Sequence, residues 1–145
     1  MTPEPFRQAA ELLRASRRSL IFTHLRPDGD ALGSSFGLQE VLRKMGLEAE
    51  VFLPGPLPDR HRKLFSGQLT KIAPEELKAF DTFIALDCAN PPRLGKPECL
   101  SMEDLRKLRF INIDLVSGSF SGAASAPGSW VRSSKEAVRC RSVFR

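Results

Sequence analysis

A histidine and two aspartates, His24, Asp28 and Asp30, lie within a stretch of seven residues in the segment THLRPDGDALGSS. Carboxylate oxygens with one imidazole suit Mn²⁺ or Mg²⁺ better than zinc, whose protein sites rely on cysteine and histidine. A neighbouring proline and glycine favour a tight turn, so the two aspartates can face two adjacent ions from one loop. The segment therefore predicts a divalent-metal site.

Small residues follow this loop. Gly33, Ser34 and Ser35 open a predicted helix without bulk, and the free N–H groups of a helix N-terminus can receive a phosphate. We expect these three residues to contact a phosphorylated substrate. The alternative is that the two aspartates are only turn and cap residues and the histidine a packed strand-end residue.

Alternating helices and strands would position these groups. Apolar periodicity and turn residues predict helices over 4–16, 30–46, 74–78 and 101–108, strands over 19–24, 47–53, 81–87 and 110–114, and polar loops over 54–63 and 88–98. Ser101 is a good N-cap for the last helix, with Asp104 completing a capping-box pattern. This order predicts an α/β fold, a parallel sheet flanked by helices.

Ligands of such folds sit at the carboxyl ends of the strands. Three predicted strands end in ionisable residues: His24 with its two following aspartates, then Asp87, then Asp114. The fold would bring these residues together although they are far apart in sequence. The presence of Asp87 at a second strand end makes the turn-and-cap alternative the weaker one.

The length and composition of the chain are those of a single globular domain. The chain has 145 residues, enough for one domain, and no apolar run near the ~20 residues that span a bilayer. The N-terminus lacks the pattern of a signal peptide, so we expect a cytoplasmic protein without membrane association. Its three cysteines give no disulfide framework and are expected to be reduced thiols.

The last part of the chain differs in composition. Residues 115–145 contain eight serines, no aspartate, and five of the basic side chains against one acidic one, which accounts for most of the net charge of +5. No clear strand precedes Val131. We therefore divide the chain into a metal-binding α/β domain, 1–114, and a divergent, Ser-rich, disordered tail, 115–145, with residues 117–130 packing poorly.

Three motifs carry a family resemblance over residues 4–114. HLRPDGDALGS resembles the first motif of the DHH superfamily of phosphoesterases, most closely the oligoribonuclease and phosphoadenosine-phosphate phosphatase branch, which is related to RecJ-like nucleases. ALDCANPPRLG, residues 85–95, resembles the second motif. FINID, residues 110–114, resembles the approach to the third, in which the aspartate is followed by two histidines.

The resemblance implies a two-metal site for Mn²⁺ or Mg²⁺. His24 and Asp28 would hold one ion, Asp30 the other, and Asp87 would bridge them. Asp87 and Asp114 would be the catalytic carboxylates, and Arg93 of the second motif a substrate contact. Two ions about 3.5–4 Å apart activate water and stabilise phosphate-ester hydrolysis. The implied substrates are short oligoribonucleotides or 3′,5′-bisphosphorylated nucleosides.

The chain departs from the family pattern after Asp114. Leu115 and Val116 stand where the family has two histidines, and no aspartate follows Asp114 in these 145 residues. We also expect the family's C-terminal substrate-gripping domain to be absent. We therefore expect one bound ion rather than two, and impaired hydrolysis. A reading-frame change after Asp114 would explain the altered tail. Against it, Ser133, Ser134 and Glu136 lie about where the family has a Ser-Ser and a glutamate.

Three functions stay open on the sequence alone. The first is a metal-dependent phosphoesterase whose partners are short oligonucleotides or phosphorylated nucleosides. The second is a catalytically inactive metal- or nucleotide-binding remnant of that family. The third, a structural α/β module, requires the first motif to be a coincidence. A homodimer is compatible with each of them.

Overall fold

A six-stranded sheet forms the centre of the molecule. The computed structural model describes residues 4–65, 71–88, 91–113, 129–133 and 136–140, and the strand order is β2-β1-β3-β4-β5-β6. The strands are β1 (Arg18–Phe22), β2 (Glu48–Val51), β3 (Thr82–Leu86), β4 (Phe110–Ile113), β5 (Ser129–Ser133) and β6 (Glu136–Cys140). The first four pair in parallel, which confirms the predicted α/β fold.

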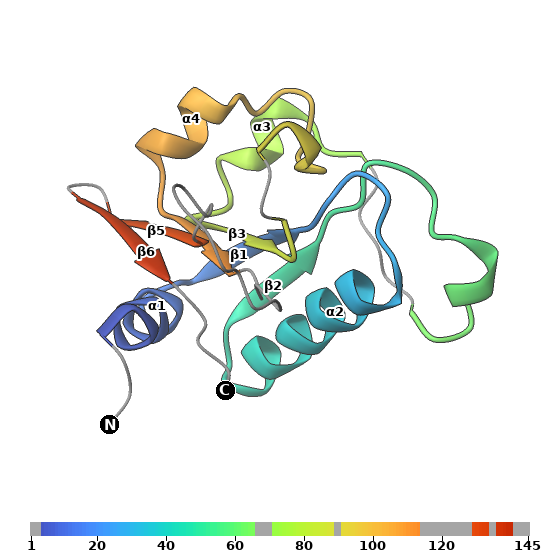
Figure 1. Ribbon diagram of the computed structural model, residues 1–145, viewed down its shortest axis with the longest axis horizontal. Helices are drawn as coiled ribbons and strands as arrows, with labels where there is room; N and C mark the ends of the chain where they lie inside the picture. The colour runs from blue at the N-terminus through green and yellow to red at the C-terminus, as the bar shows by residue number, and fades with distance from the viewer. Residues whose placement is uncertain (1–3, 66–70, 89–90, 114–128, 134–135, 141–145) are drawn as a thin grey trace, which may run out of the picture.

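Helices cover both faces of the sheet. They are α1 (Glu4–Arg14), α2 (Gly29–Lys44), α3 (Pro74–Leu77) and α4 (Met102–Lys107), with 3-10 turns η1 (Asp59–His61) and η2 (Pro91–Arg93) in the two polar loops. Figure 1 shows α1 and α2 on one side of the sheet and α3 and α4 on the other. Each predicted helix is present, and its ends differ from the prediction by no more than a few residues.

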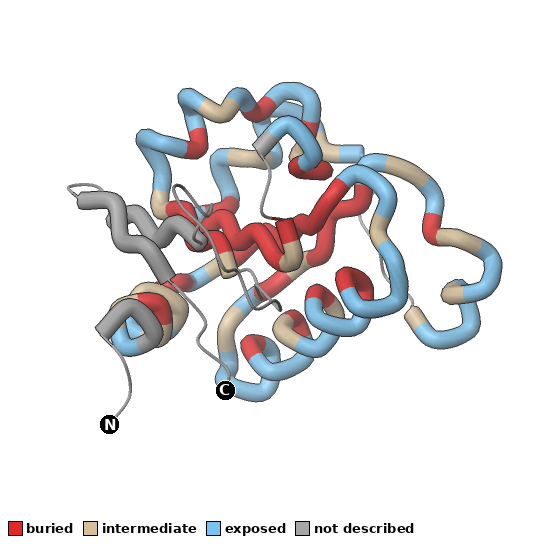
Figure 2. The backbone as a smooth tube through the Cα atoms, viewed as in Figure 1, coloured by how far each residue is buried: buried red, intermediate tan, exposed pale blue. Residues whose placement is uncertain are grey.

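Each face of the sheet has its own apolar core because side chains alternate along a strand. On β1, Phe22 packs in a cluster with Phe83 and Phe110 on the side of α3 and α4. Its neighbour Ile21 packs with Leu32 and other residues on the side of α2. The central strands are therefore buried on both faces (Figure 2), which explains their continuous apolar runs.

The pairing of β1 with β3 places the C-terminal ends of these two strands side by side. β1 pairs directly with β3, so that Phe22 lies opposite Ala85. Because the strands are parallel, the residues that follow Phe22 and Leu86 leave the sheet at the same edge. This confirms the expectation that the strands leading to His24 and Asp87 are adjacent.

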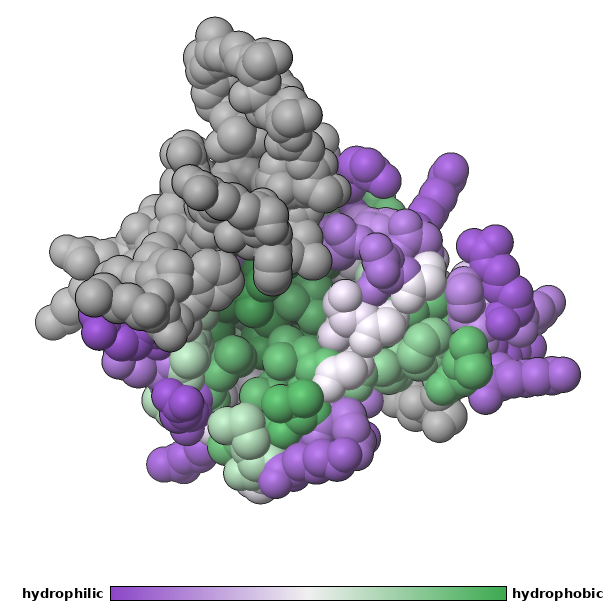
Figure 3. Space-filling view, turned by 60° about the horizontal axis from the view of Figure 1, so that its bottom comes forward, coloured by the Kyte–Doolittle hydropathy of each residue, from purple (hydrophilic) through white to green (hydrophobic). Residues whose placement is uncertain are grey.

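Not every apolar residue of α2 faces the core. Leu32 and Leu42 are fully buried, whereas Val41 and Met45 are about half exposed. Figure 3 shows apolar side chains gathered on the face that carries α1 and α2.

Within the described residues, no helix has the length and apolar character that crossing a membrane requires.

The C-terminal part extends the sheet. β5 pairs antiparallel with β4, with Ile111 opposite Val131, and β6 pairs antiparallel with β5. The expected disordered tail thus contains two strands, and the first begins at Ser129, slightly before the point where the sequence suggested one. Asp114 and most of the segment 117–130 lie outside the described residues.

Candidate metal centre

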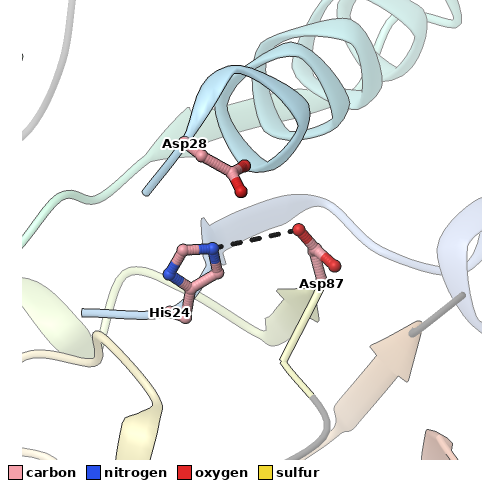
Figure 4. A group of neighbouring side chains, drawn as sticks. All are labelled: His24, Asp28 and Asp87. Carbon is pink, nitrogen blue, oxygen red and sulfur yellow. Dashed lines mark ion pairs between the residues drawn. The ribbon is translucent and has the colours of Figure 1, made fainter. Parts of the chain in front are cut away.

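Three side chains converge at the edge where β1 and β3 end. His24 follows β1, Asp28 precedes α2, and Asp87 follows β3. One ligand atom from each lies within 4.8 Å of the other two, and Figure 4 shows the two carboxylates around the imidazole. The Nε2 atom of His24 is 3.9 Å from Oδ2 of Asp87. The sequence prediction that these two strand ends meet is therefore correct.

The loop after β3 holds His24 in place. His24 forms an antiparallel bridge with Leu94. On either side of it, the backbone N–H of Leu25 donates to the carbonyl of Arg93 at 2.8 Å, and that of Gly95 donates to the carbonyl of Thr23 at 2.7 Å. The His24 side chain is 11% exposed. These hydrogen bonds join residues 23–25 to residues 93–95 and so hold the backbone that carries the imidazole in a defined position.

Gly95 allows this close approach. A Cβ atom at this position would lie 2.9 Å from the Thr23 carbonyl oxygen and 3.1 Å from that of His24, which is closer than van der Waals contact. Sequence reasoning placed Gly95 at the end of the second motif without giving it a role. The available signal was a glycine in a loop that also contains prolines, which marks close backbone approach as well as flexibility.

Asp28 serves as the N-cap of α2. Its Oδ1 accepts a hydrogen bond from the Ala31 N–H at 3.0 Å, which satisfies one of the unpaired donors at the helix start. This backbone hydrogen bond, with the nearby His24, holds the pKa of Asp28 below its usual value. The carboxylate is therefore ionised at neutral pH, as a metal ligand must be.

Asp87 has an unusual backbone conformation. Its φ is +52°, the one positive φ among the described non-glycine residues. Its N–H donates to the Ile113 carbonyl at 3.1 Å, and the side-chain amide of Asn112 donates to the carbonyl of Cys88 at 3.2 Å. A left-handed residue other than glycine costs about 1–3 kcal/mol and persists where its surroundings impose it, often at functional sites.

The donor set fits a divalent cation. Ligands on opposite sides of an ion lie about 4–5 Å apart when each bond is about 2.0–2.6 Å, so donors within 4.8 Å of one another can share one ion after small side-chain adjustments. The nitrogen that faces the carboxylates is Nε2 of His24. One imidazole and two carboxylates form a mixed nitrogen and oxygen set that hard or intermediate divalent ions accept.

Other predicted site residues lie outside this cluster. Asp30, Gly33 and Ser34 are exposed on the first turns of α2, and Arg93 is exposed on η2. Ser35 differs from the prediction, because it is fully buried and its hydroxyl donates to the Ala31 carbonyl at 2.7 Å. Its hydroxyl is thus engaged within the helix instead of facing a phosphate. Asp114 falls outside the described residues.

One known protein is similar to this chain in sequence. The bifunctional oligoribonuclease and PAP phosphatase NrnA of Thermus thermophilus is 37% identical over 97 residues, which cover 63% of this chain and 28% of that protein. The match thus spans less than a third of the relative's length. No protein-family model matches the chain.

A solved structure has a similar fold. An exopolyphosphatase-related protein from Bacteroides fragilis superposes with a TM-score of 0.63 and 23% identity, over 79% of this chain and 36% of that one. At this identity the likeness concerns the fold alone. The chain therefore resembles an oligoribonuclease and PAP phosphatase in sequence and an exopolyphosphatase-related protein in fold, in agreement with the resemblance of its motifs to the DHH superfamily of phosphoesterases.

Proposed function

We propose that this chain is the metal-binding part of a divalent-metal-dependent phosphoesterase that acts on short oligoribonucleotides or 3′,5′-bisphosphorylated nucleosides. The observation that carries the proposal is the convergence of His24, Asp28 and Asp87 within 4.8 Å at the carboxyl edge of a parallel sheet. The similarity to a bifunctional oligoribonuclease and PAP phosphatase supports the substrate class.

The three residues would act as ligands for Mn²⁺ or Mg²⁺. When bound, such an ion supplies Lewis-acid stabilisation of the phosphate ester and a water nucleophile at neutral pH. The tied backbone around His24 fixes the imidazole, and the hydrogen bond from Ala31 fixes one oxygen of Asp28. Little reorganisation is then needed when substrate binds.

Asp87 has room for a second role. Its side chain is 39% exposed, so a carboxylate oxygen can accept the proton of an attacking water. In the reaction, the water oxygen would form a bond to phosphorus while Asp87 accepts the water proton, and the bond between phosphorus and the nucleoside oxygen would break. The leaving oxygen would take up a proton from the solvent, to which the exposed Asp87 carboxyl releases the one it accepted. No covalent intermediate with the protein is required.

We further propose that turnover is low and that one ion is bound. Leu115 and Val116 occupy the positions where the third family motif has two histidines, and neither side chain can coordinate a cation or contact a phosphate. With fewer ligands, a second ion would depend on Asp30 and Asp87 with water. The alternative function, a catalytically inactive metal- or nucleotide-binding remnant, rests on the same two substitutions.

Metal titration and hydrolysis assays test the proposal together. The purified chain is titrated with Mn²⁺ by calorimetry, and short oligoribonucleotides and adenosine 3′,5′-bisphosphate are then assayed with Mn²⁺. We expect one binding event and slow hydrolysis, both abolished by Asp87→Asn. Asp59→Asn is the matched control, because Asp59 is exposed on η1 and pairs with Arg62; it should behave like the wild type.

Two outcomes would contradict parts of the proposal. Mn²⁺ binding without any hydrolysis supports the inactive remnant. Absence of Mn²⁺ binding, or binding that Asp87→Asn leaves intact, means that this cluster is not a metal site.

A further inference from the structure

A pocket lies directly beside the candidate metal centre. Its volume is ≈ 320 Å³, and it lies between the first-motif loop, residues 25–28, and the proline-rich loop after β2, residues 53–60. Asp28 belongs both to its lining and to the ligand cluster. Small-molecule sites generally measure about 300–1,000 Å³, so this pocket suits one nucleotide.

Two arginines give the pocket a positive charge. Arg26 comes from the first-motif loop and Arg60 from η1. In the part of the chain that the structure describes, neither guanidinium forms an ion pair with a carboxylate. Arginine is well suited to binding phosphate, because its planar group presents several donors in a fixed geometry.

Apolar side chains complete the lining. Leu25, which is 51% exposed, lies in the same pocket as Pro54 and Pro58. Such surfaces can contact the ring of a nucleoside while leaving its phosphates to the charged groups. The pocket thus offers an apolar part and a cationic part beside one set of metal ligands.

The proline-rich loop is anchored to α2. The rings of Phe65 and Phe36 stack with centroids 4.8 Å apart. The position of a Cβ on Gly29 would be 3.7 Å from Cε1 of His61, so η1 packs closely over the start of α2. The pocket wall that carries Arg60 is therefore fixed relative to Asp28, and binding needs little loop ordering.

We infer that Arg26 and Arg60 bind a second phosphate group of the substrate, next to the phosphate that His24, Asp28 and Asp87 address. The inference rests on the proposed function and deepens it by naming what selects the substrate. A nucleoside with two phosphates fills both subsites, whereas a nucleoside monophosphate fills one. The arginine pocket thus discriminates bisphosphorylated nucleosides and short 5′-phosphorylated oligonucleotides from simple monoesters.

Binding measurements test the proposed arginine subsite without requiring that the chain hydrolyse its substrate. The full chain is titrated by calorimetry, in Mn²⁺, with adenosine 3′,5′-bisphosphate and with AMP. We expect the wild type to bind the bisphosphate at least about tenfold more tightly than AMP, because a charge-assisted contact to one extra phosphate contributes this much. Arg26→Gln and Arg60→Gln should each remove most of that preference and leave AMP binding nearly unchanged.

Arg62→Gln is the control. Arg62 follows Arg60 on the same turn but pairs with Asp59 and does not line the pocket. The preference for bisphosphate should persist in this variant. Thermal unfolding of all variants checks that the fold is intact, and Arg26→Lys and Arg60→Lys, which keep the charge, should restore part of the preference.

The outcomes separate this inference from the proposed function. If the bisphosphate preference depends on the two arginines but no hydrolysis is found, the arginine subsite stands and the enzymatic proposal fails. If hydrolysis depends on Asp87 but Arg26→Gln and Arg60→Gln bind both ligands as the wild type does, the enzymatic proposal stands and the arginine subsite is wrong.

Discussion

Asp28 combines a structural and a chemical role in one side chain. One oxygen caps α2 through the Ala31 N–H, and the carboxylate also belongs to the cluster with His24 and Asp87. A cap and a metal ligand make different demands, because a cap needs only a short side-chain oxygen whereas a cation site favours a negative charge. The two roles can therefore be separated by substitution.

Replacing Asp28 with serine should remove the charge and keep the cap. We expect Asp28→Ser to unfold in denaturant with a free energy close to that of the wild type in EDTA. Asp28→Ala should lose about 1 kcal/mol, the usual effect of deleting an N-cap. Both variants should lose most of their Mn²⁺ affinity in calorimetry. If Asp28→Ser retained wild-type Mn²⁺ affinity, Asp28 would be a cap and nothing more.

At the level of elements, the candidate site depends on two loops that run side by side after β1 and β3. The bridge between His24 and Leu94 and the two flanking backbone hydrogen bonds join them. Gly95 is a point of close approach, with no space for a side chain against the carbonyls of Thr23 and His24. The geometry of the imidazole therefore depends on a residue that has no chemistry of its own.

A methyl group at this point should disturb both stability and the site. We expect Gly95→Ala to lower the free energy of unfolding by about 1–3 kcal/mol, as overpacking does, and to weaken Mn²⁺ binding because His24 is displaced. Gly37→Ala is the matched control. Gly37 lies within α2 with nothing within 4 Å of an added Cβ, so this change should stabilise the helix by about 0.5–1 kcal/mol. Equal stability of the two variants would contradict the packing argument.

At the level of the whole molecule, the cluster links segments that are distant in sequence. His24 and Asp28 come from the first motif and Asp87 from the end of a strand that begins at Thr82. An unfolded chain cannot hold all three around one ion, so a cation that binds the cluster binds the folded state almost exclusively. Such binding stabilises the fold by mass action.

Thermal unfolding therefore reports on the site without a substrate. At a Mn²⁺ concentration 100-fold above the dissociation constant, the folded state should gain about 2.7 kcal/mol, seen as a higher Tm that EDTA reverses. Asp87→Asn should show no such increase, while Asp59→Asn should respond like the wild type. A Tm increase of equal size in Asp87→Asn would indicate that Mn²⁺ binds elsewhere.

Local features were set by the sequence, since their causes lie within a few residues. The capping pattern of Ser101 and Asp104 predicted the start of α4, and the structure has both reciprocal hydrogen bonds. The apolar runs before His24 and after Asp81 predicted buried neighbouring strands, because a parallel sheet covered on both faces needs such runs. The first motif by itself identifies His24 and Asp28 as candidate metal ligands.

Only the tertiary structure decided the rest, because it depends on contacts between distant segments. Ser35 and its exposed neighbour Ser34 look alike in sequence, yet the rotation of α2 against the sheet buries Ser35 completely. The packing of loops against one another decides two further features. It places Gly95 against the end of β1, and it brings Arg26 and Arg60 into one pocket. Sequence periodicity determines which face of an element is apolar, whereas the approach of two loops depends on the packing of the whole domain.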